Sequence, residues 1–258
     1  METIEVSRAS GVVTITLNRP AKKNAANAQM WNELLEAFRA VASSSEDRVM
    51  VLTGAGGEFC AGADLTGGGT GGPGQHHLAQ MRHVGEVALA LHRLSIPTIA
   101  KVRGVAVGAG CNMALGCDLT VVSDTARFSE IFARRGLSID FGGSWLLPRI
   151  VGMHRAKEMA LFADIIDAAE AERIGLVNRV VPDAELDQFV DSWAARLAAG
   201  PPIALAMTKR MLDNSFQVTL EQALEDEGVA QSLNFTTADT MEAMKAFVEK
   251  REPKFEGR

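Results

Sequence analysis

The chain has 258 residues, of which 47% are hydrophobic and 22% charged, and its net charge is -6. This balance is typical of a globular protein with a sizeable core, and the acidic excess argues against nucleic acid as the main partner, because phosphate binding needs a concentrated basic face. Tyrosine is absent, which excludes every mechanism that needs a catalytic phenol.

Targeting and redox signals point to a cytoplasmic protein. The N-terminal segment "METIEVSRASGVVTITLNRP" has no basic region followed by an apolar run, so a signal peptide is not expected. No stretch approaches the roughly 18 apolar residues of a membrane span. Cys60, Cys111 and Cys117 are expected to be reduced and buried, because free cysteine packs as a small apolar residue.

The first third of the chain predicts strands followed by helices. Residues 4–20 indicate two strands about a turn at Ser10-Gly11, ended by Pro20. Apolar residues at helical spacing over 27–44 predict a helix, and Asn27 is a plausible N-cap. Residues 48–59 indicate a short buried strand that ends in a glycine turn.

The remaining two thirds begin with a glycine-rich segment, 66–75, which we predict to be a mobile loop. Residues 98–124 predict strand, glycine turn, helix and strand, and 126–152 a mixed region of loops and short helices. Helices are predicted near 77–94, 154–162, 168–173, 186–199, 201–213, 218–232 and 236–250.

Two glycine-rich turns, 53–65 and 104–116, each join a strand to a helix. Small residues let a ligand approach the backbone, and the N–H groups at a helix start are unpaired. Two such turns suggest two N–H donors that converge on one oxygen, which is an oxyanion hole. Tight strand–helix packing is the alternative, and a dinucleotide fingerprint at Gly108 fails because Met113 stands at its third glycine position.

Acidic residues near these turns are the candidates for acid–base chemistry. Asp64 is expected to cap a turn and Asp118 to make structural hydrogen bonds. Asp140 is a lone acid in the apolar segment "LSIDFGGSW", where burial would raise its pKa toward neutrality. The alternative for Asp140 is an N-cap of a helix that starts at Gly142. The five histidines lack metal-ligand spacing, so no metal site is expected.

Six segments together resemble the crotonase superfamily, the enoyl-CoA hydratase/isomerase family. They are "ITLNRPAKKNAAN", "FCAGADL", "IPTIAKVRGVAVGAGCNMALGCDL", "GLSIDFGGSWLLPRIVG", "AAEAERIGLVNRVVP" and "AFVEKREPKF". The resemblance implies an α/β fold, a spiral of ββα repeats over residues 1–195, followed by a helical region over 196–258 that packs a homotrimer or a dimer of trimers and closes the acyl pocket.

The same resemblance implies a site for an acyl-CoA thioester, with no separate cofactor. The backbone N–H groups of Ala63 and Ala109 would form the oxyanion hole, and Asp140 would move the proton. Contacts to the CoA and acyl parts would come from Lys22, Lys23, Ala25, Ala61, Asp64, Leu65, Gly110, Asn112, Phe132 and Trp145, and from Phe247 and Lys250 of the same or a neighbouring subunit.

Two departures from the family's hydratases favour an isomerase. Hydratases carry glutamates at the positions of Asn112 and Phe132, and both are absent here. Asp140 matches an aspartate of a subset of family isomerases, including the phenylacetate-pathway type. A local shift of the chain could bring Glu130, two residues before Phe132, into the position of the missing glutamate, and we favour this arrangement less. The sequence thus favours a double-bond isomerase over a hydratase with altered acid–base residues, and over a non-catalytic acyl-CoA-binding protein.

Overall fold

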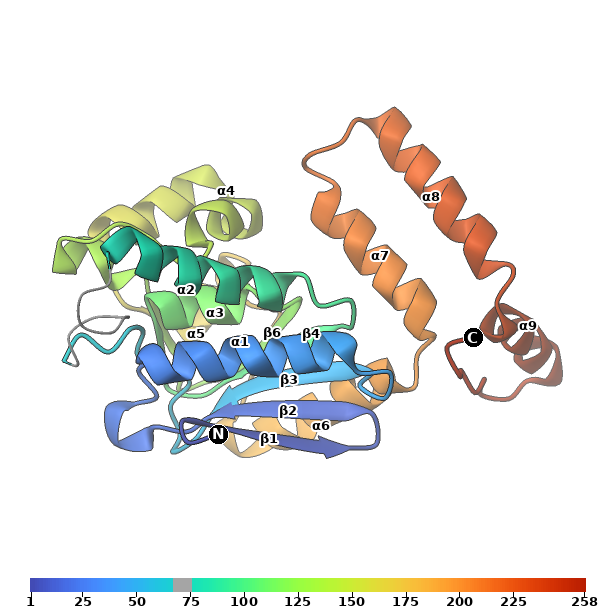
Figure 1. Ribbon diagram of the computed structural model, residues 1–258, viewed down its shortest axis with the longest axis horizontal. Coiled ribbons are helices and arrows are strands. Elements are labelled where there is room, and N and C mark those ends of the chain that lie inside the picture. The colour runs from blue at the N-terminus through green and yellow to red at the C-terminus, as the bar shows by residue number, and fades with distance from the viewer. Residues whose placement is uncertain (67–75) are drawn as a thin grey trace.

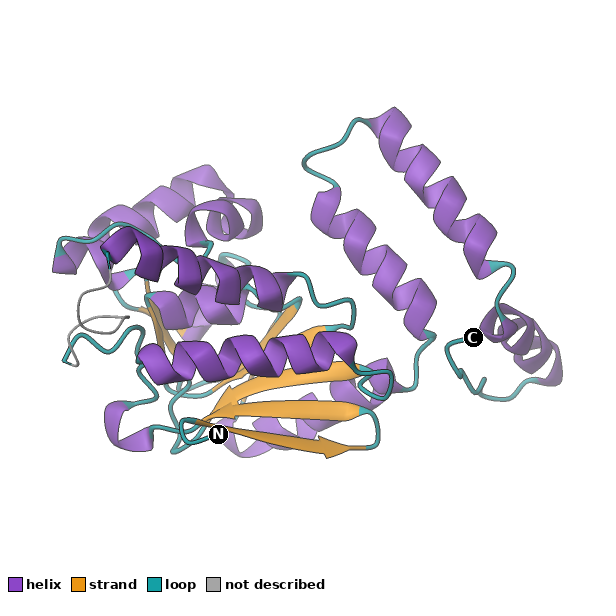
Figure 2. Ribbon diagram, in the orientation of Figure 1, coloured by secondary structure: helices purple, strands orange, loops and turns teal. Residues whose placement is uncertain are grey.

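The computed structural model describes residues 1–66 and 76–258 and shows a six-stranded sheet at the base of the molecule (Figures 1 and 2). Its order is β1-β2-β3-β4-β6-β9. The pair β1–β2 is antiparallel and every later pair is parallel. The strands are β1 (Ile4–Ala9), β2 (Val12–Leu17), β3 (Val49–Gly54), β4 (Thr98–Val102), β6 (Leu119–Ser123) and β9 (Arg179–Val181).

A second, smaller sheet has the order β5-β7-β8, with β5 (Val105–Val107), β7 (Arg127–Ser129) and β8 (Ile166–Asp167). A bridge between Cys60 and Ala106 adds the segment after β3 to it. In each turn of the spiral, one strand segment therefore joins the large sheet, the next segment joins the small sheet, and a helix follows, as in β4, β5 and α3 (Ala109–Leu115). The expected ββα spiral is confirmed, and residues 98–124 contribute one strand more than the sequence predicted.

Alternating strand residues build two cores on opposite faces of the large sheet. Met50 and Leu52 face the main core, whereas Val49 and Val51 pack with helix α6 (Leu186–Ala198). The main core is covered by α1 (Ala28–Ser43), α2 (His77–His92) and the fully buried α3 (Ala109–Leu115). The other helices of this part are η1 (Pro20–Lys22), η2 (Ile131–Arg135), α4 (Gly143–Phe162), α5 (Ala168–Arg173), η3 (Asp183–Glu185) and α6 (Leu186–Ala198).

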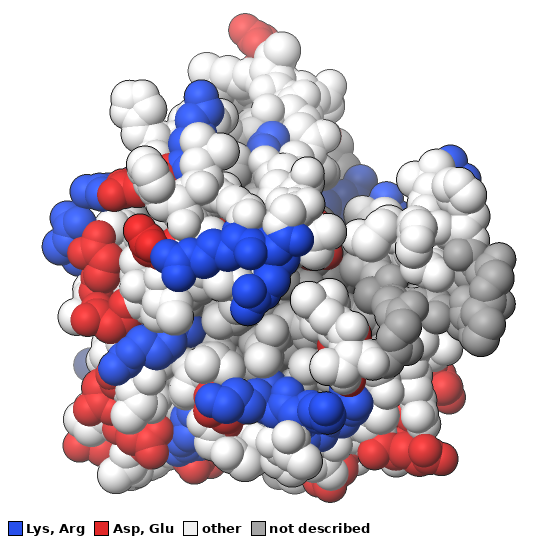
Figure 3. Space-filling view, turned by 90° about the vertical axis from the view of Figure 1, so that its left-hand side faces the viewer, with Lys and Arg blue, Asp and Glu red and all other residues white. Residues whose placement is uncertain are grey.

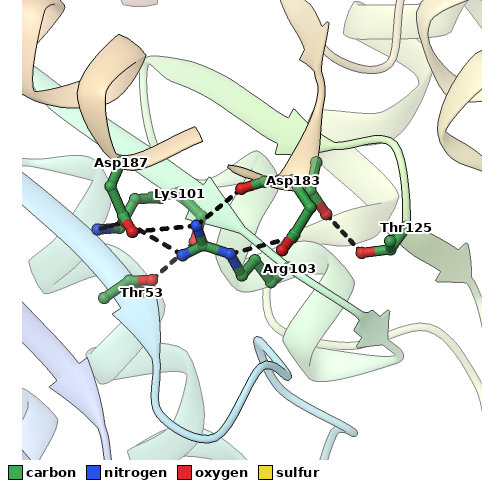
Figure 4. A network of polar contacts seen from close by, with 7 residues as sticks. Thr53, Lys101, Arg103, Thr125, Asp183 and Asp187 are labelled. Carbon is green, nitrogen blue, oxygen red and sulfur yellow. Dashed lines mark hydrogen bonds and ion pairs between the residues drawn. The ribbon is translucent and has the colours of Figure 1, made fainter. Parts of the chain in front are cut away.

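Ion pairs fix η3 and the start of α6 to the end of β4 (Figure 4). Arg103 contacts Asp183 at 3.1 Å and Asp187 at 3.0 Å, and Lys101 contacts Asp187 at 2.7 Å. Hydrogen bonds from Arg103 and then Lys101 lower the pKa of Asp187 to about 2. The pairs lie at the surface and serve mainly to set the position of α6, since exposed ion pairs contribute little stability.

The last three helices, α7 (Pro202–Asn214), α8 (Leu220–Asn234) and α9 (Ala238–Glu249), extend to one side of the sheet (Figure 1). These helices and the turn between α7 and α8 carry large apolar side chains that are mostly exposed, among them Phe216, Leu220 and Phe247. No helix of the described residues is long and apolar enough to cross a membrane.

Most predicted elements agree with the structure. Asn27 caps α1 by accepting a hydrogen bond from the Met30 N–H at 2.9 Å, and the three cysteines are free and buried. The predicted mobile loop, except its first residue, lies outside the described residues. The prediction for 126–152 was wrong in part, because α4 already begins at Gly143, runs through Pro148 and kinks at Gly152, whose φ is 77°.

Candidate active site

The two glycine-rich turns meet because glycines allow close backbone contact. Gly62 has a φ of 93°, and a Cβ there would lie 2.8 Å from the Val107 carbonyl oxygen and 3.8 Å from the Ala109 nitrogen. A Cβ on Gly110 would lie 2.3 Å from the Cys60 carbonyl oxygen. Any side chain at Gly62 or Gly110 would force the turns apart.

Two backbone N–H groups at this junction have no acceptor within the described residues. Ala109 is the first residue of α3, whose first-turn N–H groups have no helical partner. Ala63 pairs with Ala26 through a bridge in which Ala26 donates to Gly62 and Asp64 donates to Ala26, so the Ala63 N–H is not used. The two donors are suited to hold one carbonyl oxygen that develops negative charge.

Three polar residues form a cluster beside the first turn of α3. Asn112, one turn into the helix, donates through Nδ2 to Glu130 Oε2 at 3.2 Å and to the Asp140 carbonyl oxygen at 3.0 Å. Asn112 and Glu130 are completely buried. A Cβ on Gly143 would lie 2.4 Å from Asn112 Oδ1, so the start of α4 packs directly on this amide. The cluster therefore fixes the segment that carries Asp140.

Asp140 has the properties of a base near neutrality. Burial raises its pKa to about 6, and its Oδ1 is a buried atom without a hydrogen-bond partner among the described residues. The alternative that Asp140 caps the next helix is wrong: Gly142 is the N-cap of α4 and no side chain caps it. Only the Asp140 backbone contributes, by accepting from the Gly143 N–H at 3.0 Å. Its carboxylate is free for chemistry.

Glu130 is the residue that the sequence underestimated. It precedes η2, and its carboxyl is buried beneath Asn112. Burial raises its pKa to about 7, nearby Asp140 adds to the shift, and hydrogen bonds from Asn112 and Cys111 oppose it. The signal in the sequence was the same as for Asp140, a lone acid among apolar residues, here Phe128 and Phe132.

Apolar and aromatic side chains surround the cluster. Phe132 is buried, and its ring lies 3.6 Å from a Cβ built on Gly108, so it covers the start of α3. Trp145 lines a cavity of about 900 Å3 between α2, the start of α4 and α7. The Arg149 guanidinium lies 4.0 Å from the centre of the Trp145 ring, within range of a cation–π contact. Ala88, Leu89, Phe141, Leu146 and Met207 also line the cavity.

The turn before the site is held by Asn24 and Arg19, which sequence reasoning did not single out. Asn24 is buried, donates to the Ala55 and Glu58 carbonyl oxygens and accepts from the Arg19 N–H. This clamp fixes the backbone of residues 22–25, on which the two expected CoA-binding lysines, Lys22 and Lys23, are exposed.

Arg19 also pairs with Asp64 at 2.9 Å, and its guanidinium donates to the Ala25 carbonyl oxygen. Asp64 accepts from the Thr66 N–H and hydroxyl, so it caps a turn as expected. Hydrogen bonds from Thr66 and then Arg19 lower its pKa to about 2. With its carboxylate occupied in this way, Asp64 supports the turn and its side chain is not free for ligand.

Lysine and arginine side chains run in rows across the face that lies at the left of Figure 1, while acids gather toward its edge (Figure 3). Of the predicted CoA contacts, Lys23 pairs with Glu58 at 2.8 Å and keeps 59% of its side chain exposed. Leu65 is exposed. The Ala61 N–H donates a hydrogen bond to the Lys23 carbonyl oxygen. Such local positive charge suits a phosphorylated ligand on an acidic protein.

Phe247 and Lys250 lie on and after α9, away from α1, α2 and α3 (Figure 1). Phe247 is 86% exposed. The structure therefore does not bring these two residues to the oxyanion hole of their own chain. The expectation that remains is that they contact ligand bound to a neighbouring subunit. Asp118, by contrast, is structural as expected, because it accepts from Thr98 and pairs with Lys209 at 2.8 Å.

Comparisons with known proteins agree with this geometry. The family model described as enoyl-CoA hydratase/isomerase matches residues 7–258. The chain belongs to this family. It is 40% identical to a probable enoyl-CoA hydratase of Rhodobacter capsulatus, over 99% of this chain and 98% of that protein. It is 36% identical to the 1,2-epoxyphenylacetyl-CoA isomerase of Escherichia coli, over 96% of each chain.

Solved structures give the same result for the fold. A crystal structure of enoyl-CoA hydratase from Mycobacterium smegmatis matches with a TM-score of 0.92 at 35% identity, covering 98% of each chain. One from Bacillus anthracis matches with a TM-score of 0.94 at 32% identity, covering 99% of this chain and 100% of that one. The protein is thus an enzyme of the enoyl-CoA hydratase/isomerase family, most of whose similar members carry hydratase names.

Proposed function

We propose that this enzyme is an enoyl-CoA double-bond isomerase in which Asp140 carries the proton. The observation that supports this most is the Asp140 carboxylate, which has an oxygen without a partner in the part of the chain that the structure describes, does not cap α4 and has a pKa raised to about 6 by burial. It is matched to proton transfer near neutral pH, because a base works best when its pKa is close to the operating pH.

The mechanism that follows uses an acyl-CoA thioester and no separate cofactor. The thioester carbonyl oxygen accepts hydrogen bonds from the Ala63 and Ala109 N–H groups, which stabilise the enolate. Asp140 removes a proton from carbon 2 of a 3-enoyl-CoA and returns it to carbon 4. The C–H bond that breaks and the C–H bond that forms balance, and Asp140 ends in its starting state.

The cavity beside Asp140 is the proposed site of the distal acyl group. Phe141 and Gly142, which follow Asp140, line it together with Trp145, and its lining combines apolar residues with charged ones of α7 such as Lys209 and Asp213. Lysines of the 22–25 turn are proposed to face the CoA phosphates. Gly110 and Phe132 stand at the start of α3, where the thioester carbonyl would lie.

Hydratase activity is the second candidate, and Glu130 is the observation that favours it. Syn hydration needs one group to activate water and another to deliver a proton. Glu130 is a second carboxyl within the cluster, but it is fully buried and lies behind Asn112. It has no surface to offer to a substrate or an attacking water, so isomerisation by Asp140 alone fits the site better.

A panel of 2-enoyl-, 3-enoyl- and aryl-CoA thioesters followed by mass spectrometry tests the proposal. Isomerisation leaves the mass of 3-enoyl-CoA unchanged while the double bond moves, whereas hydration of 2-enoyl-CoA adds the mass of one water. Conversion of 2-enoyl-CoA to the hydrated product as the main reaction would establish the hydratase instead. Binding of CoA without turnover of any thioester would indicate a non-catalytic acyl-CoA-binding protein.

We also propose that copies of the chain assemble through the C-terminal helices into a homotrimer or a dimer of trimers. Apolar side chains exposed on α7–α9 would be buried there, since exposed apolar patches of this extent mark interfaces. They include Leu212, Phe216, Leu220, Leu224, Val229, Leu233, Met241, Met244, Phe247 and Val248. The mass of the assembly by light scattering tests this, and a monomer at micromolar concentration would contradict it.

A further inference from the structure

One amide connects the two carboxyl-bearing residues of the site. Asn112 uses its Nδ2 group twice, toward Glu130 Oε2 and toward the carbonyl oxygen of Asp140. A Cβ built on Gly143 would lie 2.4 Å from both Nδ2 and Oδ1 of this amide, so the start of α4 leaves no space around it. A change at Glu130 is therefore transmitted to the backbone that holds Asp140.

Hydrogen-bond donors are scarce in this cluster. Asn112 Oδ1, Glu130 Oε1 and Asp140 Oδ1 are all buried oxygen atoms without a partner among the described residues. The ion pairs of the described residues include none with Glu130 or Asp140. A proton on Glu130 would turn one of these acceptors into a donor, which lowers the cost of burying them.

We propose that Glu130 is a positioning residue that stays protonated during catalysis, so that Asp140 is the only charged carboxylate of the site. This proposal rests on the function proposed above, because it assumes Asp140 to be the base. The neutral Glu130 holds Asn112, and Asn112 holds the Asp140 segment. Glu130 itself neither gives nor takes the proton that moves along the substrate.

Electrostatics explain why the protonated form is the active one. The titratable groups that face Glu130 are the Cys111 thiol on α3 and the Asp140 carboxylate, and Asn112 is neutral. Like charges in a site of low dielectric resist ionising together. Ionised Glu130 would add a second negative charge beside Asp140 in a buried cluster, and would oppose a transition state in which negative charge develops on the substrate.

The pair is expected to titrate in two steps, near the values of about 6 for Asp140 and about 7 for Glu130. The rate then rises with pH as Asp140 ionises and falls as Glu130 ionises. The thiols do not interfere below pH 9, because burial raises the pKa of Cys60 to about 11 and of Cys117 to about 12, and that of Cys111 well above its ordinary value.

The test is the pH profile of kcat/KM for isomerisation of 3-enoyl-CoA by wild type and Glu130→Gln. Glutamine reproduces the donor and acceptor of a protonated glutamate and cannot ionise. Wild type should give a bell, with a loss of about tenfold per pH unit on the basic side. The variant should keep the acidic limb and lose the basic one, with a change of about twofold or less between pH 7 and 9. The control Glu36→Gln, the same change at an exposed position of α1, should keep the bell.

An identical basic limb in wild type and Glu130→Gln would overturn the proposal. If the variant folds poorly, infrared difference spectroscopy of the wild type is the deciding measurement. A protonated-carboxyl band that disappears near pH 7 and is retained in Asp140→Asn supports the proposal. Absence of that band at pH 6 overturns the proposal. Failure of the proposed function has a different signature, since Asp140→Asn would then isomerise 3-enoyl-CoA at the wild-type rate.

Discussion

The oxyanion hole can be tested by removing one N–H group while keeping the helix. Ala109 is the first residue of α3, and its N–H has no acceptor among the described residues. Proline is tolerated at this helical position because the missing N–H is not part of the helix. Ala109→Pro should therefore change the free energy of unfolding by about 1 kcal/mol or less.

The effect on catalysis should be much larger. Loss of one oxyanion-hole donor typically costs about 3–4 kcal/mol in the barrier, which corresponds to a drop of roughly 10²–10³ in kcat. The assay is kcat for isomerisation of 3-enoyl-CoA, together with the denaturant midpoint as a measure of folding. Binding of CoA should be kept, because the lysines of the 22–25 turn are unaffected.

Ala168→Pro is the matched control. Ala168 is also a buried alanine at the first position of a helix, α5, and it follows Asp167 in an extended conformation that proline permits. This variant should retain wild-type kcat. A folded Ala109→Pro enzyme with a kcat within about tenfold of wild type would refute the oxyanion-hole assignment.

Two further predictions concern the cluster and acid stability. Gly143→Ala should lower both kcat and the melting temperature, because its Cβ would lie 2.4 Å from the Asn112 amide. The control Gly228→Ala on α8 should change neither, because a Cβ there meets no atom within 4 Å. Equal behaviour of the two variants would contradict the packing of Gly143 on Asn112. Glu33 accepts hydrogen bonds from the N–H groups of Glu2 and Thr3 and from the Thr3 hydroxyl, and these outweigh its burial and lower its pKa from 4.5 to about 2. A lowered pKa means that the ionised Glu33 adds stability above pH 4.5, and that this stability is lost between about pH 4.5 and 2. Glu33→Gln should therefore lower the free energy of unfolding in urea by roughly 3 kcal/mol at pH 7 and by much less at pH 2.5. A loss that does not depend on pH would contradict this.

Local patterns predicted the elements well where one physical signal dominated. The Asn27 cap and the helices after residue 165 followed from capping chemistry and apolar spacing, and they agree with the structure within about two residues. A helix that starts at Gly142 was only an alternative in the sequence, although α4 does begin one residue later, at Gly143, and its extent to Phe162 was not predicted. Gly142 is in fact the cap of this helix, with a φ of 81°, a conformation that suits glycine.

The site was predictable only in part, because its parts come from distant segments. The resemblance placed Ala63, Ala109 and Asp140, and among the described residues the N–H groups of the first two have no acceptor and one oxygen of the third has no partner. It did not give the link from Glu130 through Asn112. That link depends on how β7 and α3 pack in three dimensions, and no spacing in the sequence encodes it.

The most direct measurement of the central claim is the rate at which Asp140→Asn isomerises 3-enoyl-CoA. Asparagine keeps the shape of the side chain and cannot accept the proton. General-base catalysis contributes typically 10²–10⁴-fold, so the account predicts a fall in kcat of at least about 100-fold with CoA binding retained. A folded Asp140→Asn enzyme that isomerises the substrate at the wild-type rate would contradict it.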